Sequence, residues 1–275
     1  MAITCGYRLL VIHAVNPYGM AYLRRFNEDN VDVNRNFVDW SKPVPENPEY
    51  KRLADVIAPL SLSFGSEVAA WAQLLWYRVK QGKAAAQAAI SGGQYSHPKG
   101  LFYGGAANTW SNRQLRSIFQ RYLSHAERVI VIDVHTGLGE FGSAEIVLNS
   151  PEDSPEHLRA LAIWGPALVE TTTSGNSVSA HLEASFKLAV ADTLPGSEVT
   201  SVSLEYGTFP PMDVFRAMRV ENWLYHYGGT ANPEAAQIKQ CMLRTFYPDS
   251  AEWKASVLNK GKQVIERALS SLESL

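Results

Sequence analysis

Polar side chains able to carry chemistry follow three stretches of sequence that resemble buried strands. They are Arg25, Asn34 and Arg35 after residues 7–15, Asp133 and His135 at the end of residues 128–134, and Glu205 at the end of residues 199–205. Open α/β sheets bind ligands at the carboxyl ends of their strands. We therefore expect these side chains, which are distant in sequence, to line one pocket.

The residue types form a coherent chemical set. A neutral imidazole can bind zinc, and a glutamate can act as a base toward a metal-bound water. One arginine can stabilise an oxyanion, and a second arginine beside an asparagine can hold a carboxylate through two hydrogen bonds. Each residue also has a structural alternative: His135 as a hydrogen-bonded residue at a strand end, Glu205 as a salt-bridge partner, and Arg35 as the partner of Asp32.

The elements that must position these residues alternate between strands and helices. Apolar runs predict strands over 7–15, 128–134, 145–148 and 199–205, and helical spacing predicts helices over 49–60, 67–90, 111–126, 155–170, 212–226, 232–245 and 250–274. The helix over 67–90 places Val68, Trp71, Leu75 and Val79 on one apolar stripe. The pattern predicts a single α/β domain over residues 1–275, with a mixed, mostly parallel sheet flanked by helices on both faces.

Composition excludes several classes of protein. Hydrophobic residues make up 46% of the 275 residues and charged residues 19%, so the chain can form a sizeable core. The 25 basic and 27 acidic residues give a net charge of −2, which argues against a broadly basic nucleic-acid binder. Two cysteines cannot form a disulfide scaffold. No apolar run approaches the ~18 residues of a membrane span, and the N-terminus lacks signal-peptide features. We expect a cytoplasmic protein with neither a nucleic-acid nor a membrane partner.

Familiar cofactor and nucleophile motifs are absent or lack their context. Residues 137–142 match G-x-G-x-x-G, but a dinucleotide site needs a helix to start there, and the strand-like run 145–148 follows instead. The sequence has no phosphate-binding P-loop, no G-x-S-x-G elbow and no C-x-x-C pair.

Several blocks together resemble a known superfamily. Asn-Pro-Tyr-Gly at 16–19, Arg25 and V-D-V-N-R-N-F at 31–37 resemble the signature of zinc carboxypeptidases of the carboxypeptidase A type. D-V-H-T-G at 133–137 resembles the strand of their third zinc ligand, and L-E-Y-G-T at 204–208 resembles their catalytic-glutamate strand. The spacing from 16 to 25 is also similar to the aspartoacylase and succinylglutamate desuccinylase branch. The whole chain looks closest to a bacterial group of this superfamily known mainly as a domain of unknown function.

The resemblance implies a zinc-dependent hydrolase that cleaves an amide bond next to a free carboxylate. It implies one zinc ion with His135 as a ligand, Glu205 as general base and acid, Arg25 as the oxyanion stabiliser, and Asn34 with Arg35 as the residues that bind the substrate carboxylate. The substrate would be a small peptide or an N-acyl amino acid. The alternatives are an N-acyl amino acid deacylase or desuccinylase, and a metal-deficient carboxylate-binding protein without activity.

The sequence departs from the family at the first two zinc ligands. The family's H-x-x-E motif precedes the Asn-Pro block, but no histidine of this chain begins such a motif. Either a segment with a strand and this motif is absent from the polypeptide, which the apolar start at 7–15 favours, or the protein is a natural derivative without a competent metal site. His13 is a possible substitute ligand, although a hydrogen-bonded strand histidine is the favoured interpretation. We expect weak zinc binding at His135 and little or no activity of this chain.

Overall fold

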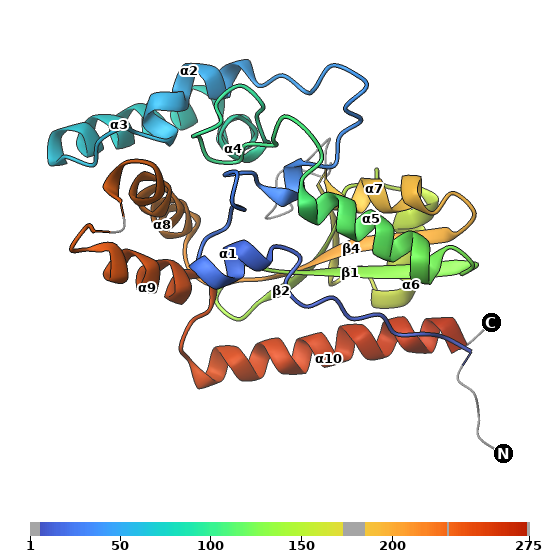
Figure 1. Ribbon diagram of the computed structural model, residues 1–275. Coiled ribbons are helices and arrows are strands. Elements are labelled where there is room, and N and C mark those ends of the chain that lie inside the picture. Colours follow the sequence, from blue (N-terminus) through green and yellow to red (C-terminus); the bar gives the residue numbers. More distant parts are fainter. Residues whose placement is uncertain (1–5, 173–184, 230, 274–275) are drawn as a thin grey trace.

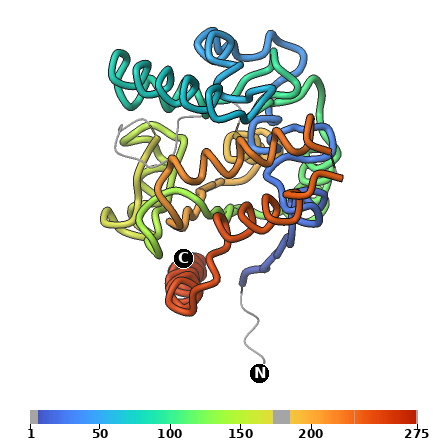
Figure 2. The backbone as a smooth tube through the Cα atoms, turned by 90° about the vertical axis from the view of Figure 1, so that its left-hand side faces the viewer, coloured from blue at the N-terminus to red at the C-terminus, as the bar shows by residue number. Residues whose placement is uncertain are grey.

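The computed structural model describes residues 6–172, 185–229 and 231–273 and shows a sheet between layers of helices (Figure 1). Helices α5 (Trp110–Leu123) and α7 (Phe186–Thr193) lie on one side of the sheet. The long helix α10 (Ala251–Glu273) runs along the other side, and Figure 2 shows it nearly end-on. The predicted α/β fold with helices on both faces is confirmed.

The sheet is mixed and has the strand order β1-β4-β2-β3 among the described residues. Its strands are β1 (Arg128–Thr136), β2 (Ala144–Leu148), β3 (Val169–Thr171) and β4 (Glu198–Tyr206). Strands β1 and β4 pair in parallel, as do β2 and β3, whereas β2 and β4 are antiparallel. The carboxyl ends of β1 and β4 therefore meet at one edge of the sheet, as the sequence predicts.

The two faces of the sheet differ because side chains alternate along each strand. On one face Val129 and Val199 pack with Phe119 and Phe186. On the other face Leu204 and its neighbours pack against Trp164 of α6 (Pro155–Trp164) and Trp253 of α10. On the face that carries Val129 and Val199, apolar side chains therefore cover the amino ends of β1 and β4. Polar residues occupy the carboxyl ends of the two strands on that same face.

The remaining helices surround this sheet. They are α1 (Pro17–Tyr22), the 3₁₀ helix η1 (Val33–Arg35), α2 (Pro48–Ile57), α3 (Phe64–Gln81), α4 (Lys83–Ser91), α6 (Pro155–Trp164), α8 (Pro211–Trp223), the π-helix η2 (Leu224–Gly228) and α9 (Ala235–Phe246).

Helix boundaries follow the capping residues in the sequence. Asn47 accepts a hydrogen bond from the Tyr50 N–H at the start of α2, and Thr109 caps α5 in the same way, two residues before the predicted cap at Ser111. The helix predicted over 67–90 is two helices. Gly82 separates α3 from α4 with a φ of +87°, a conformation that favours glycine.

The strand predicted over 7–15 is wrong. This segment has no regular secondary structure from Gly6 to Ile12, and the side chains of Leu9 and Val11 are 69% and 76% exposed. Ile12 and Val15 do pack against the core cluster that contains Val129. Some apolar side chains of the segment therefore pack against the core, but its backbone does not pair with the open edge of β1.

None of the helices that the structure describes combines the length and the apolar character needed to cross a lipid bilayer.

Candidate active site

The parallel pairing of β1 and β4 brings His135 and Glu205 together. Their Cα atoms are register partners, so both side chains leave the same face of the sheet. Neighbouring strands are ~4.8 Å apart, which places the two side chains within reach of one bound molecule. Asp133 lies two residues before His135 and therefore on the same face. This cluster of Asp133, His135 and Glu205 is the candidate acid–base site.

Asp133 orients His135 and favours its charged form. Nε2 of His135 lies 2.6 Å from Oδ2 of Asp133. A carboxylate can only accept, so Nε2 carries the hydrogen and Nδ1 is the nitrogen left for other partners. Burial opposes the imidazolium, but the charge and hydrogen bond of Asp133 outweigh it, together with Glu205, and raise the pKa of His135.

Glu205 is a buried carboxyl held beside two cationic groups. Burial raises its pKa, and this effect exceeds the opposing influence of His135, of the Leu138 N–H and of Arg25. The Leu138 N–H donates to Oε1 at 3.1 Å, which fixes the orientation of the carboxyl group. A carboxyl with a raised pKa is suited to both accepting and returning a proton near neutral pH.

The Asn-Pro-Tyr-Gly block positions Arg25. Asn16 caps α1 by accepting from the Gly19 N–H, and its Nδ2 donates to the Arg25 carbonyl at 3.0 Å. The chain packs so tightly here that a Cβ on Gly19 would lie 2.5 Å from the Arg24 carbonyl oxygen. The block is therefore a scaffold for the backbone at Arg25. The positive charge of Arg25 acts to lower the pKa values of both His135 and Glu205.

A buried carboxylate, Asp32, joins the two predicted arginines. Its Oδ2 lies 2.9 Å from Nε of Arg25 and 3.2 Å from Nη1 of Arg35. Burial opposes ionisation of Asp32, but the two guanidiniums and the Asn34 N–H hold its pKa below the usual range. Asp32 also caps η1, so one side chain both shapes the loop and balances its positive charge.

Asn34 and Arg35 make structural contacts. The Arg35 side chain is 6% exposed, pairs with Asp32, and donates from Nη2 to the Ser91 carbonyl at 2.6 Å. Its Nε has no hydrogen-bond partner among the described residues and is buried. Oδ1 of Asn34 accepts from the Phe186 N–H at 3.2 Å. This arrangement favours the structural alternative given for Arg35 and assigns Asn34 a structural contact as well. The Arg25 side chain is 25% exposed and better placed to meet a ligand.

Sequence reasoning missed Lys187, which belongs to the same electrostatic cluster. Its Nζ donates to the Val147 carbonyl at 2.9 Å. Burial lowers its pKa to about 8, against the opposing charges of Asp133, Glu205 and Glu156. No local signal reveals this residue, because α7 is a short helix that the apolar pattern did not predict.

A second residue that sequence reasoning missed is a carboxylate, and the sheet register reveals it. Glu145 of β2 is the antiparallel partner of Glu205, so the two side chains leave the same face. Opposed side chains on antiparallel strands are ~5 Å apart at their Cβ atoms. The alternation of the A-E-I-V-L run could have shown that Glu145 faces away from Ile146, but only the pairing places it beside Glu205.

The described residues do not form the zinc site that the resemblance implies. No three histidine, cysteine, aspartate or glutamate side chains within residues 6–172, 185–229 and 231–273 are grouped so that they could hold a metal ion. Nε2 of His135 is engaged by Asp133, and His13 is exposed to solvent on the segment before α1. A catalytic zinc needs about three protein ligands, so these residues by themselves do not fit the ion.

The glycine-rich turn after β1 contributes a hydrogen bond to the acid–base site and does not form a dinucleotide-binding site. It leads into strand β2, and no helix N-terminus is present to hold a pyrophosphate. A Cβ on Gly207 would lie 1.8 Å from the Glu140 carbonyl oxygen, so the turn can approach the end of β4 only at a glycine. This close approach places the Leu138 N–H on Glu205.

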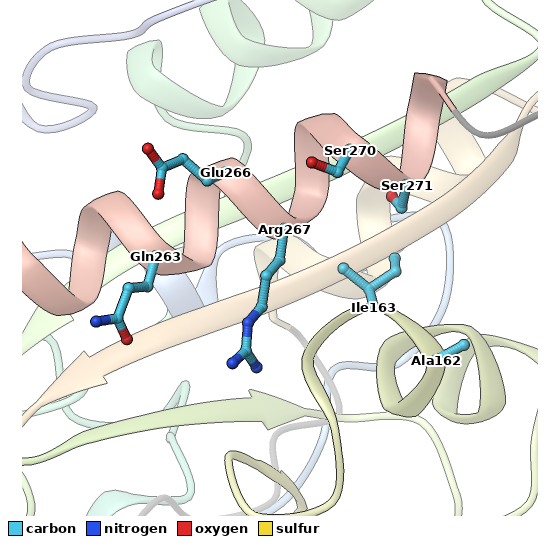
Figure 3. Close-up of a pocket in the computed structure, with 7 residues that line it drawn as sticks. All are labelled: Ala162, Ile163, Gln263, Glu266, Arg267, Ser270 and Ser271. Carbon is cyan, nitrogen blue, oxygen red and sulfur yellow. The ribbon is translucent and has the colours of Figure 1, made fainter.

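A shallow hollow elsewhere on the surface is unrelated to this chemistry. It lies between α6 and α10, with Glu266 and Arg267 among its lining side chains (Figure 3). These helices cover the other face of the sheet, and none of the predicted site residues lines the hollow.

Comparison with known proteins gives a family for the chain. Residues 3–260 match a family described as a protein of unknown function, DUF2817, and the chain belongs to this family. No curated protein and no solved structure matches the chain.

Proposed function

We propose that the protein is a hydrolase of the carboxypeptidase-like superfamily that cleaves an amide bond next to a free carboxylate in a small peptide or an N-acyl amino acid. One observation carries the proposal: the parallel register that pairs His135 with Glu205. The positive charge of Arg25, which acts on the pKa of each, supports it. A base, an oriented imidazolium and a partly exposed guanidinium around one position are groups that suit amide hydrolysis.

The chain's own residues account for each proton transfer. Ionised Glu205 takes a proton from a bound water as the water oxygen bonds to the amide carbon. Arg25 and the imidazolium of His135 stabilise the negative charge that develops on the carbonyl oxygen. When the carbon–nitrogen bond breaks, Glu205 returns its proton to the leaving nitrogen, so the products are a carboxylic acid and an amine.

The zinc ion remains a prediction from the sequence resemblance. The described residues contain no group of three side chains that could bind a metal ion, so the proposed proton transfers involve protein residues alone. The expectation of little or no activity, drawn from the sequence, assumed that catalysis requires a zinc ion. A mechanism carried by Glu205, His135 and Arg25 instead predicts slow turnover that a chelator does not abolish.

A substrate panel tests the proposal. N-acetyl and N-succinyl amino acids and dipeptides would be compared with the same compounds amidated at the free carboxylate, by measuring primary-amine release with added zinc or with chelator. We expect release from the free acids and at least ~10-fold less from the amides, because one charged hydrogen-bonded contact is worth roughly 1.5–3 kcal/mol. Equal rates for acids and amides would contradict the substrate class, and no release in either condition would contradict the hydrolase.

A second candidate function is carboxylate binding without turnover. The lack of a three-ligand group among the described residues favours it. Calorimetric titration with N-acyl amino acids would detect it as binding that Arg25→Gln weakens, with the titrated compound recovered intact.

A further inference from the structure

The outer face of α3 carries an apolar stripe that no described residue covers. The inner face of the helix packs into the core through Ala70, Leu74 and Tyr77. The outward residues, at spacings of four, four, three and four, are all exposed and uncharged: Phe64, Val68, Ala72, Leu75 and Val79. Figure 1 shows α3 at the periphery of the molecule, above α8 and away from the sheet.

Val68, Leu75 and Val79 belong to the stripe that the sequence pattern predicts, and the fold leaves all three exposed. Trp71 turns inward and packs edge-on against Phe215. Phe64 and Val79, at the two ends of the stripe, are 87% and 78% exposed. Isolated exposed apolar residues are ordinary, but a contiguous helical stripe of them marks an interaction surface.

Apolar positions along the stripe are related by reversal about a point between Trp71 and Ala72. Reversing the helix about this point superposes Phe64 on Val79 and Val68 on Leu75, with the small Ala72 near the centre. We propose that α3 packs antiparallel against α3 of a second copy of this chain, around a two-fold axis close to Ala72. Two-fold interfaces use the same patch on both partners, so a self-complementary stripe is what such an interface requires.

The available area fits a modest dimer. The 18 residues of α3 span about 27 Å. With Leu60 and Trp76 at its margins, the stripe exposes about six large apolar side chains. At roughly 100 Å² each, the contact would bury about 600 Å² per copy, or roughly 1,200 Å² in total, the lower end of stable interfaces.

Charge selects the antiparallel arrangement. The C-terminal turn of α3 carries Arg78 and Lys80, and Glu67 near the other end is already paired with Arg219. Parallel packing would bring the two basic ends together. Antiparallel packing separates them by most of the helix length, well beyond the ~8 Å over which charges interact at physiological salt.

The mass of the protein in solution tests the proposal. Sedimentation equilibrium of the full chain between ~1 and 100 µM should show a concentration-dependent dimer, and Leu75→Glu should yield a monomer across this range. Leu258→Glu is the matched control, because Leu258 is 72% exposed on α10. A wild-type monomer at 100 µM, or a dimer that survives Leu75→Glu, would overturn the proposal.

Cross-linking tests the position of the axis. In a background with Cys5→Ser and Cys241→Ser, Ala72→Cys should form a disulfide between copies on mild oxidation, because the two-fold axis brings these residues within ~4–7 Å at their Cα atoms. Gln73→Cys, one residue away and off the stripe, should remain a thiol. Equal cross-linking at both positions would reject the arrangement. Wild-type monomers that bind anionic lipid vesicles through Leu75 would assign the stripe to a membrane surface instead.

Discussion

At the level of single residues, the carboxylate of Asp32 stabilises the loop that carries Arg25 and Arg35. It is 3% exposed and contacts both Arg25 and Arg35. We predict that Asp32→Asn lowers the free energy of unfolding by ~3–5 kcal/mol, because it leaves the buried guanidinium of Arg35 and the partly buried guanidinium of Arg25 without their counter-ion. Urea denaturation would measure the loss. Asp39→Asn, which removes an exposed partner of Lys42, should change stability little, and equal losses in both variants would contradict this role.

The titration of Glu205 and His135 sets the expected pH dependence of turnover. Glu205 must be ionised to act as the base, so the rate should rise with pH through its raised pKa. His135 must remain an imidazolium, so the rate should fall as pH passes its raised pKa. Asp133→Asn removes the charge that stabilises the imidazolium, and it should move the alkaline limb of the pH–rate profile to lower pH. An unchanged alkaline limb would mean that His135 does not act in this form.

The sequence predicts which residues form the site better than it predicts the contacts that they make. His135 and Glu205 could be predicted as neighbours because each ends a buried strand, and parallel strands align their carboxyl ends. The pairing of Arg35 with Asp32 was one of the alternatives that the sequence offered. The hydrogen bond from Arg35 to the Ser91 carbonyl could not be predicted, because Ser91 lies at a distant helix end. Lys187 shows the same limit, since a lysine in an unpredicted helix gives no signal of burial.

At the scale of elements, the π-helix η2 holds a histidine that burial keeps neutral. Burial lowers the pKa of His226 to about 4, with Arg24 and Lys99 acting in the same direction. An unfolded histidine titrates near 6.5, so the unfolded chain binds more protons between pH 6.5 and 4, and stability falls as pH is lowered through this window. Allowing for partial exposure, we predict that wild type loses ~1–2 kcal/mol more than His226→Gln between pH 7 and 4. Parallel stability curves for the two proteins would contradict this prediction.

Helices and strands with a strong periodicity of apolar residues could be predicted from sequence. Strands that exist only through pairing with another strand could not. Helix α2 and strand β4 follow their periodicity and caps closely. The apolar run at 7–15 satisfies the same strand pattern, yet a strand exists only where its backbone finds a pairing edge. Strand β3 has only three residues and is defined by its pairing with β2, so no sequence window could reveal it.

At the scale of the whole molecule, the acid–base site and the apolar stripe of α3 are separate features. The site lies at the carboxyl ends of β1 and β4, whereas α3 packs on α2, α4 and the residues of α8 (Figure 1). We predict that Leu75→Glu abolishes the dimer and leaves the rate of amine release within about twofold, because distant sites without shared contacts act independently. A parallel loss of both properties in enzyme assays and sedimentation would show that the site depends on the dimer.

The most direct test of the central claim is the rate of amine release by Glu205→Gln relative to wild type, on the best substrate of the panel. Glutamine keeps the size of the side chain but cannot take a proton from water, so we predict a loss of ~10²–10⁴-fold in a protein that still unfolds cooperatively. Glu127→Gln, at an exposed position before β1, should retain the wild-type rate. A Glu205→Gln protein that releases amine as fast as wild type would contradict the role of Glu205 as the general base.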